Sequence, residues 1–161
     1  KCQYAVESQG FDACIDHHAE NFAVQLQQAC PEGIDIYYEN VGGKVFDAVL
    51  PLLNTSARIP VCGLVANYNA TALPAGPDRL ALLMSTILIK RLTMRGFIIF
   101  DDYGPRYPEF HADMQKWLAN QQISYREDRV QGLSNAPEAF IGLLQGSNFG
   151  KLVIQVGPEE P

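Results

Sequence analysis

The sequence predicts an α/β fold in which helices flank a parallel sheet, and three observations support this prediction. Short apolar runs, each too brief for a helix, alternate with longer segments whose apolar residues recur at helical spacing. The runs are apolar at consecutive positions, as a strand covered on both faces requires. The chain opens on a segment of helical period with no strand before it, whereas a doubly wound sheet starts with a strand. We therefore expect a sheet whose first part is missing.

Each expected element follows from this alternation. The expected strands are 12–16, 34–38, 58–63, 93–100 and 151–156. The expected helices are 1–12, 19–30, 44–53, 80–88, 106–122 and 136–146. Asp78 is expected to cap the fourth helix, and residues 54–58, whose side chains compete for backbone hydrogen bonds, are expected to end the third. The length of the repeating unit changes after about residue 122, which predicts a boundary there.

Composition and charge narrow the class of partner. The 161-residue chain is 47% hydrophobic and carries a formal net charge of −6, so it can bury one core. The negative charge argues against nucleic acid or an anionic membrane as the main partner and favours a small soluble ligand. No uncharged apolar run approaches the roughly 20 residues of a membrane helix, and no signal segment is found. We expect a cytoplasmic protein with four reduced cysteines.

Polar, glycine-containing turns follow two neighbouring strands of the expected sheet. Asn40 and two glycines come after the second strand, and Gly63 and Tyr68 come after the third. In open parallel sheets the loops beyond the carboxyl ends of the strands bind ligands, so these turns are expected to face one way. Glycine lets a ligand approach the main chain, Asn40 offers a donor and an acceptor, and the Tyr68 phenol can donate a proton. An ordinary turn uses the same residue types, and most loop tyrosines simply bury the ring.

Two other polar strand ends have a weaker claim to function. Asp101 and Asp102 follow the fourth strand, where a metal site or acid/base chemistry competes with a solvated loop. Asp16, His17 and His18 close the first strand, but adjacent side chains on a strand diverge and no further ligand is indicated, so we expect no metal site. The sequence contains no G-x-G-x-x-G turn, Walker loop or G-x-S-x-G motif.

Three stretches carry a resemblance to a known family: "YYENVGGKVFDAVLPLLNTSARIPVCGLVANYNAT", "GFIIFDDYG" and "NAPEAFIGLLQGSNFGKLV". With them the sequence resembles the C-terminal part of a zinc-independent, NADPH-dependent reductase of the medium-chain dehydrogenase/reductase superfamily. It is most similar to the bacterial curcumin and double-bond reductases, and less so to prostaglandin and alkenal reductases. The resemblance covers nearly the whole chain. It implies a Rossmann-like parallel sheet with flanking helices that lacks its first βαβ unit.

The resemblance also implies a division of the chain. Residues 1–122 would be the C-terminal part of the dinucleotide-binding domain, and residues 123–161 would be the returning segment of the GroES-like catalytic domain. The Gly-rich turn that holds the pyrophosphate would be absent. The change of unit length near residue 122 agrees with this division.

NADPH is the cofactor that the resemblance implies. Lys1 matches a lysine that pairs with the adenosine 2′-phosphate. His17 stands where many relatives have a tyrosine near that phosphate, so its role departs from the family pattern. The remaining implied cofactor contacts are Asn40, Cys62, Gly63, Tyr68, Phe97, Ile98, Ile99 and Asn148.

The implied reaction is hydride transfer from NADPH to the β-carbon of an α,β-unsaturated ketone or aldehyde, with protonation of the α-carbon. Tyr68 is the expected hydrogen-bond or proton donor.

Two other interpretations of the chain's function stay open. The chain could be a non-catalytic nucleotide-binding or dimerisation module, since family dimers join sheets through edge strands and 96–100 is apolar. The third interpretation is a flavodoxin-like domain. The lack of a first strand and of a phosphate loop argues against it.

Overall fold

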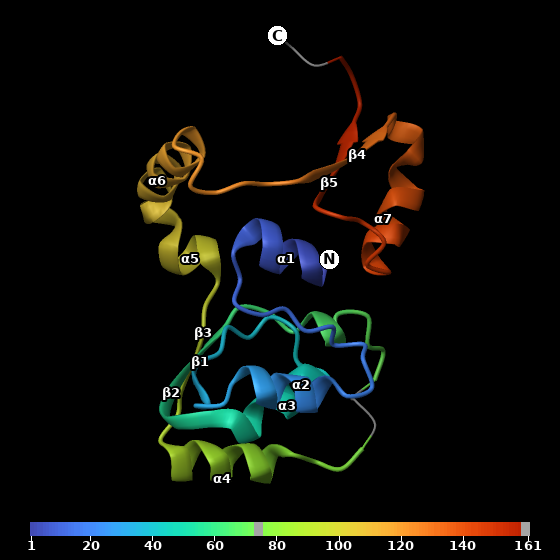
Figure 1. Cartoon of the computed structure of the whole chain (residues 1–161). Coiled ribbons are helices and arrows are strands. Elements are labelled where there is room, and N and C mark those ends of the chain that lie inside the picture. The colour runs from blue at the N-terminus through green and yellow to red at the C-terminus, as the bar shows by residue number, and fades with distance from the viewer. Residues whose placement is uncertain (73–75, 159–161) are drawn as a thin grey trace. The chain divides into compact units, whose positions relative to one another are not determined.

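In a computed structural model, residues 1–72 and 76–158 are described. The chain alternates short helices and strands (Figure 1). It divides into two compact units. The sheet unit comprises Ala13–Pro108, with which Cys2 is grouped, and the terminal unit comprises Lys1, Gln3–Asp12 and the chain from Glu109 onward. The division predicted near residue 122 stays a prediction.

The sheet unit is built on three parallel strands in the order β1-β2-β3. These are β1 (Ile34–Ile36), β2 (Leu53–Val61) and β3 (Thr93–Gly96). β2 lies in the centre and pairs with β3 in regular register, from Arg58 opposite Thr93 to Val61 opposite Gly96. An isolated parallel bridge joins Glu39 to Val61, so pairing continues past the end of β1. The three strands therefore finish close to one level of the sheet.

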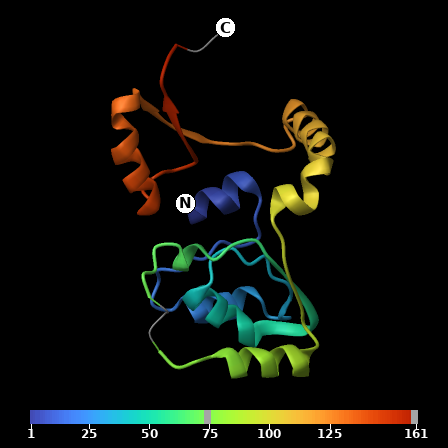
Figure 2. The same cartoon turned by 180° about the vertical axis from the view of Figure 1, so that it is seen from behind.

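Helices and short 3-10 turns precede, connect and follow these strands. They are α2 (Phe22–Ala29), α3 (Gly43–Val49), η1 (Leu50–Leu52), η2 (Val65–Asn67), α4 (Leu80–Lys90), α5 (Ile99–Tyr103) and η3 (Gly104–Arg106). Helices α2 and α3 contact each other, and α4 contacts β2 (Figures 1 and 2). Asp78 accepts the Leu80 N–H at 2.8 Å ahead of α4, but Arg79 holds the N-cap position, so the predicted cap lies one residue too early.

The core of the sheet unit lies along the central strand. Its buried apolar residues are Val49, Leu50, Leu53, Ala57, Ile59 and Leu92. Side chains from α2, α3 and α4 pack against this cluster, including Leu26, Phe46 and Ile87. Burial of such side chains stabilises the fold by roughly 1.5–3 kcal/mol each. The sheet and its helices thus provide a rigid base for the loops beyond the strands.

The terminal unit contains a two-stranded parallel sheet of β4 (Glu127–Gln131) and β5 (Lys151–Gln155). Its helices are α1 (Cys2–Gln9), α6 (Tyr107–Ala119), η4 (Leu133–Asn135) and α7 (Ala136–Leu144). The Phe149 ring is central to it: Tyr4 meets this ring edge-on with centroids 5.1 Å apart, and the Arg126 guanidinium lies 4.1 Å from its centroid. An aromatic edge contact and a cation–π contact of this kind tie α1 to the turn before β5.

The parallel α/β architecture confirms the predicted fold class, but three element predictions are wrong. Residues 12–16 form no strand, since Asp16 begins a turn in which its carbonyl accepts the Ala19 N–H at 3.0 Å. Residues 54–58 lie inside β2 instead of ending a helix: Leu53 and Arg58 pair with β1, and burial of Ala57 overrides the local preference of Asn, Thr and Ser. The fourth strand ends at Gly96, and Ile99 already begins α5.

The helices of the described part are all short. The longest, α6, has 13 residues. No helix within 1–72 or 76–158 combines the length and apolarity that crossing a bilayer would take.

Candidate functional site at the strand ends

The candidate site lies beyond the carboxyl ends of the three strands of the sheet unit. Backbone hydrogen bonds extend the ladder there: the Glu39 N–H donates to Pro60 O at 2.9 Å, and the Phe97 N–H donates to Val61 O at 3.3 Å. The loops that follow, 40–43, 62–69 and 97–98, therefore leave the sheet side by side. This is the place where open parallel sheets bind ligands.

Glu39 joins two of these loops through its main chain and its side chain. Its carbonyl accepts the Cys62 N–H at 2.8 Å and the Gly63 N–H at 3.3 Å. Its carboxylate Oε1 accepts the Val41 N–H at 2.7 Å and the Gly42 N–H at 2.8 Å. Such charge-assisted bonds are stronger than neutral ones, so Glu39 fixes both loops at once.

The Glu39 side chain is the one buried polar or charged side chain in the part of the chain that the structure describes, at 2% exposure. Its second oxygen, Oε2, is buried and has no hydrogen-bond partner among those residues. Burial, followed by the negative charge of Glu39 and a hydrogen bond toward it, raises the pKa of the Tyr37 hydroxyl above its ordinary value. The phenol thus approaches the carboxylate without closing a well-formed bond to Oε2.

Sequence reasoning missed Glu39. A glutamate after an apolar run is an ordinary way to end a strand. The signal that could have found it is its position directly before Asn40, Val41 and two glycines. A turn of that kind leaves backbone N–H groups free, and an adjacent carboxylate can accept them.

Gly42 adopts a conformation that other residues rarely reach. Its φ of 76° and ψ of −161° lie in a region essentially restricted to glycine. A methyl group on Gly42 would lie 3.3 Å from Leu64 Cδ2, so the two loops also touch here. The Val65 N–H donates to Asn40 O at 3.1 Å and the Ala66 N–H donates to Val41 O at 2.9 Å. The predicted need for glycine in this turn is therefore met at Gly42.

Asn40, Gly63 and Tyr68 lie together, as the strand-end argument expects. A methyl group on Gly63 would stand 2.6 Å from Asn40 Oδ1 and 2.7 Å from the Tyr68 hydroxyl oxygen. Only a residue without a side chain fits between these two polar groups. The Tyr68 side chain is 68% exposed, and its hydroxyl lies beside an amide that can both donate and accept.

A cavity of about 530 Å³ lies along these loops within the sheet unit. Five of the predicted site residues line it: Cys62, Gly63, Tyr68, Phe97 and Ile98. Leu64 and Asp102 line it as well. Pockets of this size are ordinary small-ligand sites.

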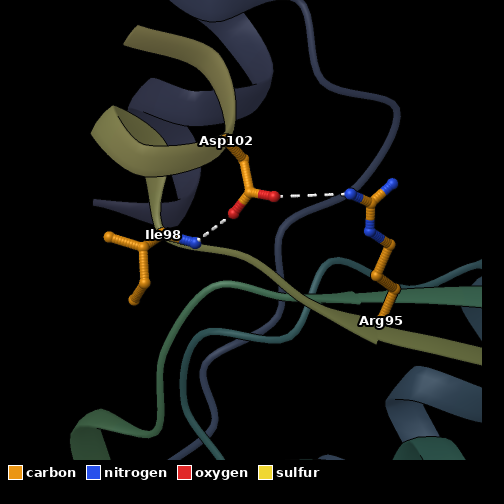
Figure 3. A network of polar contacts seen from close by, with 3 residues as sticks. All are labelled: Arg95, Ile98 and Asp102. Carbon is orange, nitrogen blue, oxygen red and sulfur yellow. Dashed lines mark hydrogen bonds and ion pairs between the residues drawn. The ribbon is translucent and has the colours of Figure 1, made fainter.

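Asp102 holds the loop on the β3 side of the cavity (Figure 3). Its Oδ2 accepts the Ile98 N–H at 2.9 Å, and its Oδ1 lies 3.3 Å from Arg95 Nη2. The Asp102 N–H in turn donates to Ile98 O at 2.9 Å. This reciprocal pair explains why the chain bends after Phe97 instead of continuing as a strand. The sequence left three interpretations open for this aspartate: a metal ligand, an acid/base group or part of a solvated loop. The structure adds that Asp102 shapes the turn.

The other predicted site residues are not in this cavity lining. Ile99 is the first residue of α5 and is 56% exposed. His17 is exposed, in the turn before α2. Lys1 and Asn148 belong to the terminal unit, where Lys1 Nζ donates to Gly146 O at 2.5 Å and Asn148 Nδ2 donates to Gly150 O at 2.7 Å.

Comparison with known proteins defines the class. The family described as "Zinc-binding dehydrogenase" matches residues 9–154, and the chain belongs to this family. It is 65% identical over 160 residues to the NADPH-dependent curcumin reductase of Escherichia coli, covering 99% of the chain and 46% of that protein. It is 38% identical over 151 residues to the 2-alkenal reductase (NADP(+)-dependent) of Nicotiana tabacum, covering 93% and 42%.

A solved structure agrees with these relatives. The crystal structure of CurA in complex with NADPH from Vibrio vulnificus superposes with a TM-score of 0.92 at 66% identity, covering 98% of this chain and 47% of that one. The resemblance drawn from the sequence and the Rossmann-type fold are thereby confirmed. The chain spans about half the length of the relatives it matches.

The family description mentions zinc, so the available ligands matter. A catalytic zinc takes three protein ligands and a water, and a structural zinc takes four. The cavity lining offers only Cys62 and Asp102, which is too few for either. Within 1–72 and 76–158, one group of three or more such side chains is close enough to share an ion: Asp16, His17 and His18. The expectation that these side chains diverge is wrong, because a turn stands where a strand was predicted.

Proposed function

We propose that the chain is the cofactor-side portion of an NADPH-dependent reductase that reduces the C=C bond of α,β-unsaturated ketones and aldehydes. The observation that carries this proposal is the convergence of Asn40, Gly63 and Tyr68 beside a cavity at the ends of parallel strands. The names of the relatives, curcumin reductase and 2-alkenal reductase, support the substrate class. The solved complex with NADPH supports the cofactor.

The cofactor, when bound, supplies the hydride. Gly63 lets it approach the main chain, and the Asn40 amide orients it from the β1 side. Phe97, Ile98 and Ile99 offer a main-chain edge for its carboxamide, although Asp102 already occupies the Ile98 N–H. The family resemblance is the support for proposing Asn148, Lys1 and His17 as further cofactor contacts, with the 2′-phosphate as the group that Lys1 and His17 would bind.

Tyr68 is the proposed catalytic residue. Negative charge develops on the carbonyl oxygen of an enone when hydride reaches its β-carbon. A positioned hydroxyl stabilises that charge by several kcal/mol, or supplies the proton that the α-carbon takes up. Asn40 Oδ1 and the Tyr68 hydroxyl oxygen both lie close to Gly63.

Substitution of Tyr68 tests the reaction. In the reductase as its source makes it, Tyr68→Phe is expected to lower kcat on an enone by about 10²-fold while leaving the NADPH dissociation constant within a factor of three. Tyr125→Phe is the control, because Tyr125 is also an exposed tyrosine, at 71%. Unchanged turnover in Tyr68→Phe would remove Tyr68 from the mechanism.

Substitution of Gly63 tests the cofactor site. Gly63→Ala is expected to weaken NADPH binding at least tenfold, because its methyl group displaces both Asn40 and Tyr68. Gly104→Ala is the control, since a methyl group there meets nothing within 4 Å. NADPH fluorescence titration reports both variants. Equal affinity in Gly63→Ala would place the cofactor elsewhere.

The finer properties are also proposals. We infer that the chemistry needs no zinc, because the cavity lining holds two possible ligands. A homodimer is proposed through the β3 edge of the sheet, to be measured by light scattering.

A cytoplasmic location fits four cysteines that are all free thiols. The division at residue 122 into a dinucleotide-binding part and a returning GroES-like part is proposed as well.

The second candidate function is a non-catalytic nucleotide-binding or dimerisation module. The observation that favours it is the exposed apolar run Ile98, Ile99 and Phe100, which follows the β3 edge of the sheet. A mass measurement of the protein from its source separates the two. A subunit of roughly twice this length supports the reductase, and a mature chain that begins at Lys1 supports the module.

A further inference from the structure

Asp16, His17 and His18 form a compact group of ligand side chains that the proposed reaction does not use as a group. One ligand atom from each lies within 4.8 Å of the others. The two imidazole rings have centroids 4.0 Å apart and are tilted by 40°. We propose that these three side chains bind a divalent transition-metal ion, such as Zn²⁺, at the surface of the sheet unit.

The backbone explains why three consecutive side chains come together. In a strand they would point to alternate faces. Here Asp16 Oδ1 accepts the His18 N–H at 2.9 Å, and Asp16 O accepts the Ala19 N–H at 3.0 Å. These two bonds fold the segment into a turn ahead of α2, which brings both rings beside the carboxylate. The second oxygen of Asp16 remains able to act as a ligand.

The donor set matches a borderline metal. Tetrahedral Zn²⁺ with bonds of about 2.0–2.1 Å to nitrogen separates its ligand atoms by about 3.3 Å. Small side-chain rotations reach this separation from 4.8 Å, since all three side chains are exposed. Two imidazoles and a carboxylate leave one position for water and favour Zn²⁺ and Cu²⁺ over Mg²⁺.

None of the three side chains lines the cavity at the strand ends, so Zn²⁺ binding can be measured in the absence of nucleotide.

Calorimetric titration of the purified protein with ZnSO₄ tests the site. One Zn²⁺ per chain is expected, with Cu²⁺ binding more tightly and Mg²⁺ giving no signal. His17→Gln, His18→Gln and Asp16→Asn should each weaken Zn²⁺ binding about tenfold or more. His111→Gln, which removes the third histidine of the chain, should leave the affinity unchanged.

The Zn²⁺ affinities of these variants determine whether the metal site is supported or contradicted. Full affinity in either His17→Gln or His18→Gln, or a loss in His111→Gln equal to theirs, would overturn it. Circular dichroism of each variant confirms that the fold is kept, which is expected for exposed side chains. Zinc binding in a protein that binds no NADPH would remove the proposed function and leave the metal site standing.

Discussion

Two loops of the candidate site are held by the same device in very different surroundings. After β1, the Glu39 carboxylate accepts the N–H groups of Val41 and Gly42. After β3, the Asp102 carboxylate accepts the Ile98 N–H. Glu39 is 2% exposed, whereas the Asp102 side chain is 31% exposed and faces Arg95. A buried hydrogen bond to a charge is worth more, and costs more to break, than a solvated one.

The comparison teaches where the site is rigid. The β1 loop depends on one side chain that water cannot replace, while solvent can substitute for Asp102. Substitutions in the two loops should therefore lower the free energy of unfolding by different amounts, although both carboxylates accept backbone N–H groups.

Glu39→Ala is expected to have the largest effect. It leaves the Val41 and Gly42 N–H groups without their acceptor, which should lower the free energy of unfolding by about 3 kcal/mol. Glu39→Gln keeps an acceptor oxygen and should cost about 1 kcal/mol. Urea denaturation followed by circular dichroism measures both. Equal stability of the Ala and Gln variants would show that the hydrogen bonds do not hold the loop.

Gly42→Ala comes next. Its backbone angles are strained for any residue with a side chain, and the methyl group would press on Leu64. A loss of about 2 kcal/mol is expected. Gly104→Ala, at a helical φ of −48°, is the matched control and should change little. A loss as large in the control would point to a general effect of removing glycine.

A smaller, pH-dependent effect is expected at Tyr37. Its folded-state pKa is raised above the ordinary value of 10.0 by burial and by Glu39. The unfolded chain releases this proton first, so the stabilising contribution is complete below pH 10 and is lost as the pH rises above it. Denaturation measured from about pH 8 to about pH 11 should show a steeper loss of unfolding free energy in the wild type than in Tyr37→Phe. Identical slopes would contradict the burial of the phenol beside Glu39.

Asp102→Asn should have the smallest effect. The amide oxygen can still accept the Ile98 N–H, and the lost ion pair with Arg95 is exposed. A change of about 0.5 kcal/mol or less is expected. A loss comparable with that of Glu39→Ala would mean that exposure does not separate the two loops.

The sequence predicted the parallel α/β class because the runs 34–38, 58–63 and 151–156 are short, mostly apolar and separated by segments of helical period. It failed at residues 54–58, where burial of Ala57 in the central strand outweighs polar neighbours. The predicted strand 93–100 was also wrong at Ile99, where α5 begins. The hydrogen bond from the Asp102 N–H to Ile98 O turns the chain there, and the spacing of apolar residues does not predict such a bond.

The grouping of Asn40, Gly63 and Tyr68 was predictable from a rule about strand ends, which needs only the order of elements. Glu39 was not. Its importance depends on complete burial, and burial depends on contacts with the neighbouring loop that no local pattern encodes. The turn at Asp16 was missed for a similar reason, since one aspartate bond decides between strand and turn.

The double role of Glu39, through its carbonyl and its carboxylate, has a consequence for how the loops open. The Glu39 carbonyl accepts hydrogen bonds from the Cys62 and Gly63 N–H groups, and its side chain accepts those of Val41 and Gly42. Opening of one loop should therefore disturb the hydrogen bonds that hold the other. These four amides should exchange with deuterium at a common slow rate, as one cooperative unit. A nucleotide that binds as proposed at the strand ends would then contact loops that are already ordered.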